Sequence, residues 1–350
     1  MARAPEIEER WIADAIDGVP TPGEHDHLFG HGEARAAFER AERSGQMHHA
    51  WLLSGPRGIG KATFAFDAAA RLLGSRERDD PVRRQIARGA HPGLLHLART
   101  YDEKGKRFRT QLPIDEIRRT QAFFGMTAAG GDRRVCIVDP ADEMSIGAAN
   151  ALLKVLEEPP RGATFFVISH QPGRLLPTIR SRCRHLPMRP LDEGEVEAAV
   201  RALLPDVRDD ALDAATRVAS GAPRQALLAL QGEVLSNFAR FEKIASAADE
   251  GRLDWQGAHG VAEKLSTRAA GAEFDQFIDL AQRWIAERAR AGAADAGATP
   301  RSLAAWARLW ERTVDNLERV RTFNLDRKQL VLDLFADVFE TLAAQSTGPR

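Results

Sequence analysis

The chain has 350 residues, of which 43% are hydrophobic and 28% are charged, with 49 basic and 50 acidic side chains. Its net charge of -1 excludes both a uniformly basic protein that coats nucleic acid and an acidic disordered chain. The sequence has no run of about 18 apolar residues and no apolar signal region, so we expect a cytoplasmic protein without a membrane span. The two cysteines, Cys136 and Cys183, are too few for a disulfide scaffold or a cysteine-rich zinc site.

Short apolar segments alternate with helical periods in the first half of the chain, after a helical stretch near Glu33–Arg43. Three runs rich in β-branched, aromatic or other large apolar residues predict buried strands, at Ala50–Ser54, Arg134–Asp139 and Ala163–Ser169. Apolar positions three or four residues apart predict helices at Ala62–Leu73 and Ser145–Glu158, the second ended by two prolines. This alternation predicts a parallel sheet covered by helices on both faces.

Strand signals stop after about residue 190. Short helices are predicted at Asp192–Leu204 and Ala211–Leu230, with a break near Gly221. Longer helices are predicted at Phe238–Ala248, Ala272–Ala291, Leu303–Arg321 and Arg327–Ala344, with a flexible connector at Ala291–Thr299. The predicted domains are an α/β domain over residues 1–189, a small helical domain over 190–233 and a helical domain over 234–350.

A glycine-rich loop, Gly55-Pro56-Arg57-Gly58-Ile59-Gly60-Lys61, lies between a predicted strand and a predicted helix. In this context Gly55, Gly58 and Gly60 let backbone N–H groups surround phosphates, and Lys61 reaches the outer phosphates. The motif normally places Ser or Thr next to hold Mg²⁺, but Ala62 stands there, and Thr63 is rotated by about 100° around the helix. Nucleotide binding therefore stays open, whereas Ala62 argues against metal binding.

The strand that ends at Asp139 lacks a second part of a hydrolytic site. A hydrolytic ATPase of this type ends the strand with Asp-Glu, the aspartate for Mg²⁺ and the glutamate to orient water. Asp139 can still face a metal, but Pro140 follows it and cannot act on water. Glu143, one turn further on, is the alternative candidate for that base. We favour the interpretation that both loops persist as scaffold without catalysis.

Two further motifs carry a family resemblance. Asn150-Ala-Leu-Leu-Lys-Val-Leu-Glu-Glu-Pro-Pro160 and the triplet Ser181-Arg182-Cys183 resemble the clamp-loader branch of the AAA+ ATPases, over roughly residues 24 to 232. The resemblance implies an α/β P-loop AAA+ domain, then a small helical lid and an all-α C-terminal collar that joins five subunits. Motor subunits of the branch carry four zinc-binding cysteines after the first helix. Gly74–His91 contains none, so we predict no zinc. Within this branch the defective loops, with Ala62 and Pro140, indicate a stator rather than a motor.

The resemblance also assigns roles to single residues. It makes Arg182 an arginine finger that acts in trans on the neighbour's ATP, since a guanidinium can stabilise charge on the γ-phosphate. Six arginines and no acidic residue lie between Arg161 and Arg189, so we expect no local ion-pair partner for Arg182. Ser169 matches the first sensor and Arg224 the second. With Gly55, Gly58, Gly60, Lys61 and Asp139 they would form a degenerate site for ATP or ADP.

The partners implied by the resemblance are gamma/tau-type motor subunits and a delta-type subunit in a hetero-pentamer, the sliding clamp, and primed DNA without sequence specificity. We expect no independent enzymatic activity, but membership in a DNA-directed DNA polymerase (nucleotidyltransferase) holoenzyme. The helix Ser145–Glu158 and the arginines Arg133 and Arg134 are candidates for contact with DNA phosphates, or else a solvated surface. Two alternatives remain: an ATP-hydrolysing motor of the same loader, and a nucleotide-sensing DNA-repair scaffold.

Overall fold

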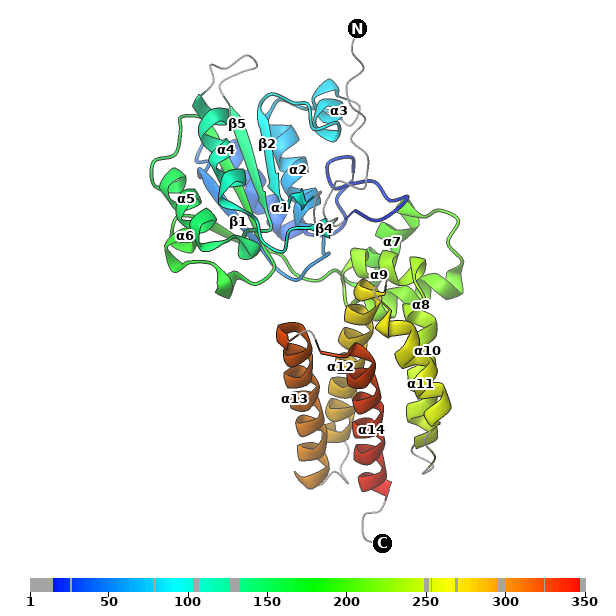
Figure 1. The fold of residues 1–350 in the computed structure, drawn as a ribbon. Helices are drawn as coiled ribbons and strands as arrows, with labels where there is room; N and C mark the ends of the chain where they lie inside the picture. The colour runs from blue at the N-terminus through cyan, green and yellow to red at the C-terminus, as the bar shows by residue number, and fades with distance from the viewer. Residues whose placement is uncertain are drawn as a thin grey trace. The chain divides into compact units, whose positions relative to one another are not determined.

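The computed structural model describes residues 15–25, 27–77, 80–102, 107–125, 133–248, 252, 254–267, 270–294, 300–323 and 325–346 (Figure 1). The chain divides into two compact units, residues 1–227 and 228–350. The division into three domains stays a prediction, because the first unit holds both the α/β part and most of the predicted small helical domain. Within the described residues no helix is long and apolar enough to cross a bilayer.

A five-stranded parallel sheet forms the centre of the first unit, in the order β2-β5-β6-β1-β7. The strands are β1 (Ala50–Ser54), β2 (Leu94–Ala98), β5 (Arg134–Asp139), β6 (Ala163–Ser169) and β7 (Arg184–Pro187). The three predicted strands are confirmed and lie side by side, with Ala50 opposite Phe165 and Arg134 opposite Ala163. The prediction missed β2 and β7 because they are the edge strands, and a half-exposed edge lacks a continuous apolar run.

Helices cover both faces of this sheet, as predicted (Figure 1). One face is covered by α1 (Gly32–Arg43) and α2 (Lys61–Leu72). The ring of Phe38 on α1 contacts Trp51 of β1 and Phe64 of α2 edge-on, with centroid distances of 5.3 and 5.9 Å. These aromatic contacts fix the helix that carries the glycine-rich loop against the sheet.

The other face is covered by α4 (Ile114–Gly125), α5 (Ile146–Glu157) and the short α6 (Pro177–Ser181). Each contributes a fully buried side chain to one core, and these are Ile117, Leu152 and Ile179. The hydroxyl of Ser145 caps α5 by accepting a hydrogen bond from the N–H of Ala148, 3.2 Å away. Two smaller elements, α3 (Pro81–Ala87) and the hairpin β3 (Tyr101–Asp102) and β4 (Arg107–Phe108), lie outside the sheet order.

Three helices complete the first unit: α7 (Glu193–Leu203), α8 (Asp209–Ala219) and the start of α9 (Pro223–Gln231). The predicted break near Gly221 is confirmed, since α8 ends before it and α9 begins after it. Gly221 has a φ of 74°, and a Cβ atom there would lie 2.5 Å from the carbonyl oxygen of Leu191. Only glycine fits this turn without backbone movement.

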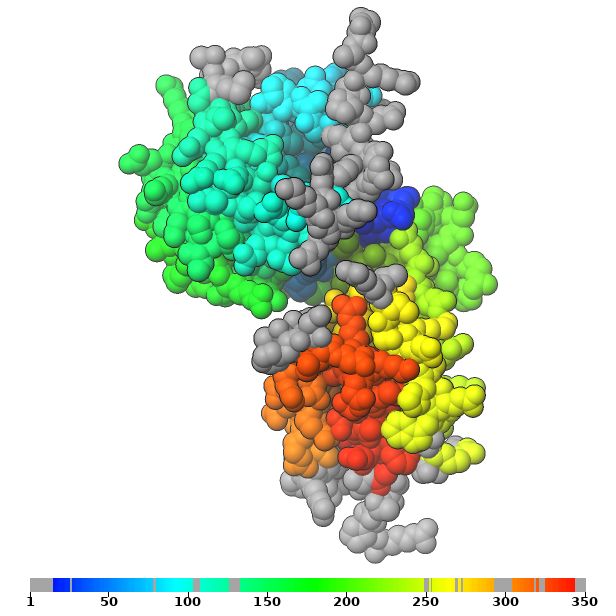
Figure 2. Space-filling view, in the orientation of Figure 1, coloured from blue at the N-terminus to red at the C-terminus, as the bar shows by residue number. Residues whose placement is uncertain are grey.

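The second unit is a bundle of α10 (Val234–Ala248), α11 (Trp255–Ser266), α12 (Gly271–Ala294), α13 (Pro300–Phe323) and α14 (Arg327–Ser346). Figure 2 shows α13 and α14 side by side on one face of this unit. The prediction missed α11, whose two glycines lower its helix propensity. The predicted connector is partly wrong, because α12 continues to Ala294. The remainder of the connector, residues 295–299, lies outside the described residues.

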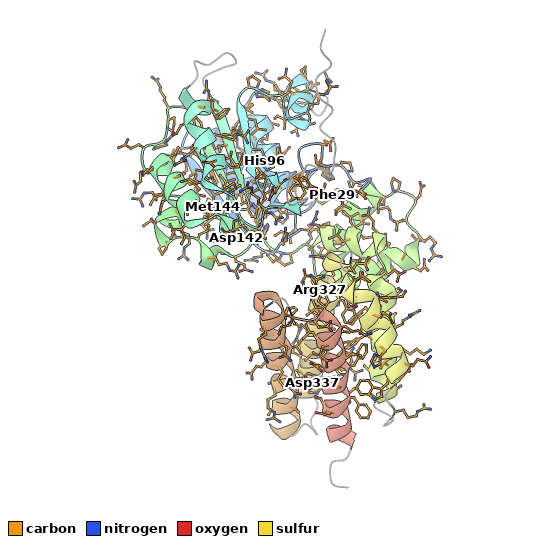
Figure 3. All side chains as sticks on the ribbon, viewed as in Figure 1. Phe29, His96, Asp142, Met144, Arg327 and Asp337 are labelled. Atoms are coloured by element: carbon orange, nitrogen blue, oxygen red, sulfur yellow. The ribbon has the colours of Figure 1, made fainter. Side chains whose placement is uncertain are left out.

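The bundle core is aromatic. The ring of Phe241 is fully buried and contacts four other rings at centroid distances of 5.3 to 5.8 Å, namely Phe238, Phe277, Trp284 and Phe335. The core also contains buried apolar side chains of α12, namely those of Phe274, Phe277, Leu280, Ala281 and Trp284. At the rim, the guanidinium of Arg327 lies 5.1 Å from the ring centroid of Phe274, and Arg312 pairs with Asp337 at 3.1 Å (Figure 3).

Candidate functional site

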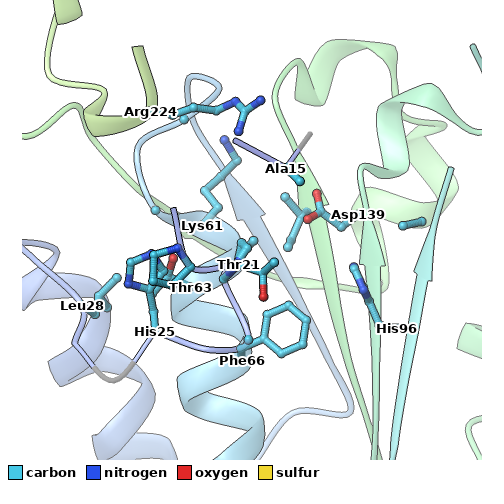
Figure 4. A pocket seen from close by; sticks show the side chains of 18 of the residues that line it. Ala15, Thr21, His25, Leu28, Lys61, Thr63, Phe66, His96, Asp139 and Arg224 are labelled. Atoms are coloured by element: carbon cyan, nitrogen blue, oxygen red, sulfur yellow. The ribbon is translucent and has the colours of Figure 1, made fainter. Parts of the chain in front are cut away.

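A cavity of about 490 Å³ lies at the carboxyl ends of β1 and β5, the usual place for a ligand in a parallel α/β sheet. Figure 4 shows Lys61 and Arg224 on one side of it and Asp139 with His96 on the other. Of the predicted nucleotide-site residues, the cavity wall includes Gly58, Gly60, Lys61, Asp139 and Arg224. The fold thus brings together residues that lie more than 160 positions apart in the sequence.

The glycine-rich loop needs its glycines for two physical reasons. Gly55, Gly58 and Gly60 all have positive φ, at 151°, 84° and 104°. In addition, a Cβ on Gly55 would lie 2.2 Å from the carbonyl oxygen of Met188, and one on Gly58 would lie 2.8 Å from Cβ of Arg224. The loop is therefore held tightly from β7 and from α9, although Gly55 itself does not line the cavity.

Lys61 is engaged by its own loop. Its side chain is buried, and Nζ donates hydrogen bonds to the carbonyl oxygens of Gly55 at 2.6 Å and Pro56 at 2.5 Å. Burial lowers the pKa of this ammonium to about 8, against the opposing effect of the carboxylates of Asp139 and Asp142. A phosphate that entered the loop would have to replace these two carbonyl oxygens as the hydrogen-bond acceptor of the ammonium.

The lowered pKa of Lys61 predicts a pH dependence of stability. The folded value of about 8 lies below the unfolded value of 10.5, so the unfolded chain binds more protons between these limits. The free energy of unfolding should therefore rise with pH across this window, by about 3 kcal/mol relative to a Lys61→Met variant. Urea denaturation of both proteins at pH 7.5, 9 and 10.5 measures this difference. A difference that stays constant with pH would contradict the lowered pKa.

Glu143, the alternative candidate for the missing base, is paired with arginines. Its carboxylate lies 3.1 Å from Nε of Arg99 and 3.8 Å from Nη1 of Arg57. The neighbouring Asp142 accepts a hydrogen bond from the backbone N–H of His170 at 2.8 Å. A carboxylate between two guanidinium groups is a weak proton acceptor, so Glu143 does not have the environment of a general base.

The two sensor positions differ in their placement. Arg224 is the second residue of α9. It lines the cavity, and its backbone N–H donates to the carbonyl oxygen of Gly58 at 3.3 Å. Ser169 does not line the cavity, although its neighbours Ile168 and His170 do. Alternation along β6 turns the Ser169 side chain to the other face of the sheet. Its hydroxyl is fully buried there and has no hydrogen-bond partner among the described residues.

Arg182 lies away from this cavity, directly after α6. Its side chain is 36% exposed, Nη1 donates to the carbonyl oxygen of Thr178 at 3.0 Å, and Nη2 pairs with Oε1 of Glu157 at 2.8 Å. The expectation that Arg182 has no local ion-pair partner is therefore wrong. Glu157 belongs to α5, outside the segment free of acidic residues, and the packing of α5 on α6 brings it close.

Polar side chains that could bind a metal ion, such as that of His31, have other contacts. Nε2 of His31 lies 2.6 Å from the carbonyl oxygen of Ile59, and burial lowers the pKa of this imidazole. Within Gly74–His91, the segment where no zinc is predicted, Asp80 caps α3 and Arg83 pairs with Asp67 at 2.7 Å. Among the described residues no three His, Cys, Asp or Glu side chains are arranged to hold a metal ion. The expected absence of zinc stays a prediction.

Two of the candidate DNA-contact residues, Arg133 and Arg134, lie at the start of β5. Arg133 is exposed, whereas the guanidinium of Arg134 lies 5.5 Å from the ring centroid of Phe123 and donates to the carbonyl oxygen of that residue. Arg134 is thus used in part to hold α4. Contact with DNA stays a prediction.

Sequence reasoning missed His96 as a cavity residue. Its side chain lies against the ring of Phe66 at 5.2 Å, and burial lowers its pKa to about 4, so it is neutral at pH 7. The signal that could have revealed it is the alternation of Leu94–Ala98, which places His96 on the opposite face from Leu95 and Leu97.

Comparison with known proteins gives the following similarities. Residues 30–192 match the family described as DNA polymerase III, delta subunit. The chain is 39% identical over 186 residues to the DNA polymerase III subunit delta' of Pseudomonas aeruginosa, covering 51% of this chain and 54% of that protein. It is 34% identical over 209 residues to the subunit delta' of Escherichia coli, covering 57% and 60%. It is 30% identical over 197 residues to the DNA polymerase III subunit gamma of Buchnera aphidicola, covering 53% and 52%. The chain thus spans between about half and three fifths of the length of these relatives.

Proposed function

Because this chain belongs, through residues 30–192, to the clamp-loader family of AAA+ proteins, we propose that it is a delta'-type stator subunit of a DNA polymerase III clamp loader. In this role it supplies Arg182 to the ATP site of a neighbouring motor subunit while the sliding clamp is loaded onto primed DNA. It has no catalytic turnover of its own and contributes to a polymerase holoenzyme in the cytoplasm.

The observation that carries the proposal is a contrast between two sites of the chain. Its own cavity lacks groups needed to hydrolyse ATP, whereas the arginine of the triplet is present at a different place. The chain's own cavity has Ala62 where a magnesium-binding hydroxyl is needed and Pro140 where a base is needed, and Lys61 is bound to its own loop. Arg182, in contrast, lies outside that cavity, with a side chain that is partly exposed and paired with Glu157. An arginine that cannot reach its own site is suited to act on another subunit's nucleotide.

The partners in this proposal are gamma/tau-type motors and a delta-type subunit in a hetero-pentamer. The second unit, with its apolar helices, supplies the collar contacts, and DNA is contacted through phosphates without sequence specificity. ATP or ADP are the ligands that the cavity would bind, without hydrolysis. We propose no zinc site. Support for membership in this assembly comes from the similarity to both delta' and gamma subunits.

The two alternatives are less well supported. An ATP-hydrolysing motor needs the groups that Ala62 and Pro140 replace, and the pairing of Glu143 with Arg57 and Arg99 removes its substitute base. A free-standing DNA-repair scaffold would give Arg182 of the Ser181-Arg182-Cys183 triplet no neighbouring ATP site to act on. Gel filtration with and without the motor subunit separates this second alternative from the stator.

The proposal predicts that the isolated chain hydrolyses no ATP above the buffer blank, because its site lacks both the magnesium ligand and the base. A reconstituted loader with clamp and primed DNA should hydrolyse ATP, and omission of this chain should lower that rate. Release of inorganic phosphate measures both. Turnover by the isolated chain would identify a motor, and a loader indifferent to omission of the chain would refute the stator role.

A further inference from the structure

Arg182 is held in place from behind by two groups of its own chain. Nη2 lies 2.8 Å from Oε1 of Glu157, and Nη1 donates to the carbonyl oxygen of Thr178 at 3.0 Å. A guanidinium has five N–H donors in a rigid plane, and these two contacts use two of them. Three donors therefore remain for an anion while both restraints stay in place.

The core beneath these residues fixes the distance between them. Leu156, directly before Glu157, and Cys183, directly after Arg182, are buried in the same hydrophobic cluster, as is Ile179 of α6. The backbones on both sides of the ion pair are thus anchored by packing. The two charged side chains extend from this core to the surface. The side chain of Arg182 is 36% exposed and that of Glu157 is 43% exposed.

The position of Glu157 in its helix is unfavourable without Arg182. It is the last residue of α5, where the partial negative charge of the helix end repels a carboxylate. The following residue, Glu158, is also acidic and exposed, but no ion pair of its side chain with another described residue is found. Of these two adjacent exposed acids, Glu157 is the one that contacts Arg182.

We propose that Glu157 is a positioning residue for the arginine finger, an inference that rests on the proposed role of Arg182. The carboxylate reduces the number of rotamers that the long Arg182 side chain visits before a neighbour's ATP is bound. Less conformational entropy is then lost when the guanidinium meets the γ-phosphate. Glu157 contributes to the turnover of the neighbouring site through Arg182 alone, without touching the nucleotide.

The test uses the full chain in the reconstituted loader with clamp and primed DNA. Glu157→Gln should lower kcat for ATP at the site that faces Arg182 by about threefold to fivefold, the size expected for a half-exposed ion pair, while KM for ATP is unchanged. Glu158→Gln, which removes the same charge one residue away, should leave kcat as in the wild type. Glu157→Asp should recover part of the loss.

The decisive comparison repeats Glu157→Gln in an Arg182→Ala background. If Glu157 acts through Arg182, the second substitution has no further effect there. An equal loss of kcat in both backgrounds would show that Glu157 acts on structure and not through Arg182. A higher kcat for Glu157→Gln would show that the ion pair inhibits Arg182. Either result overturns the proposal. If Arg182→Ala lowers the rate but Glu157→Gln does not, the positioning role fails and the stator function stands. If Arg182→Ala has no effect, the proposed function fails and this inference fails with it.

Discussion

Replacing Arg182 by alanine in the assembled loader is expected to lower ATP hydrolysis at the facing motor site by about 10³-fold, the size typical of an arginine finger. In the proposed role, the guanidinium supplies positive charge to the neighbour's γ-phosphate as charge spreads over its oxygens, and no water molecule offers the same fixed fork of donors. In a loader with several motor sites the total rate falls less, since the other sites keep their own fingers. Single-turnover hydrolysis, which resolves a fast and a slow fraction of sites, measures this effect.

Arg180 provides a matched control for this experiment. It is an exposed arginine on α6, two residues before Arg182, so Arg180→Ala removes the same charge from nearly the same place. The rate should be close to that of the wild type if the effect belongs to the finger rather than to the net charge of the surface. Equal losses for the two variants, or none for Arg182→Ala, would contradict an arginine that acts in trans.

Replacing Phe241 by alanine should lower the free energy of unfolding of the second unit by about 3–5 kcal/mol. The ring is fully buried and touches four other aromatic rings, so its removal leaves a cavity that the surrounding rings are too rigid to fill. Urea denaturation of the full chain, followed by circular dichroism of the helices, measures the loss.

Trp310→Ala is the control for the bundle. Trp310 is another aromatic residue of the same unit, but its side chain is 44% exposed on α13, and alanine suits a helix. We expect a change of less than about 1 kcal/mol. If both substitutions destabilise the bundle equally, burial does not account for its stability.

The central strands and the glycine-rich loop could be predicted because their signals are local. A strand buried on both faces needs a continuous apolar run, and β5 and β6 have one. The edge strand β7 is mostly exposed, so Arg184–Pro187 shows no such run. α11 was missed for the same reason, the lack of a local signal. This helix depends on packing in the bundle rather than on its own glycine-containing sequence.

Within the site, the sequence shows which catalytic groups are replaced, but it did not predict which side chains contact one another. The replacements at Ala62 and Pro140 are visible in the sequence, whereas the pair Arg182–Glu157 joins residues 25 positions apart on two elements. Counting acidic residues along the chain missed it, because the helix that ends at Glu157 folds back beside α6. The orientation of Ser169, however, follows from simple alternation with its cavity-lining neighbours, and parity along the strand could have predicted it.

The junction between α9 and the glycine-rich loop has a consequence for how this unit responds to salt. The two are joined by the backbone N–H of Arg224 and the carbonyl of Gly58, and nearby the N–H of Leu191 donates to the carbonyl of Gly221 at 2.9 Å. These bonds involve no formal charge, so counterions do not weaken them, whereas at 1 M ionic strength the Debye length shrinks to about 3 Å and attenuates a half-exposed ion pair. Concentrated salt therefore weakens the pair of Arg182 with Glu157, while the junction of α9 with the glycine-rich loop keeps its shape.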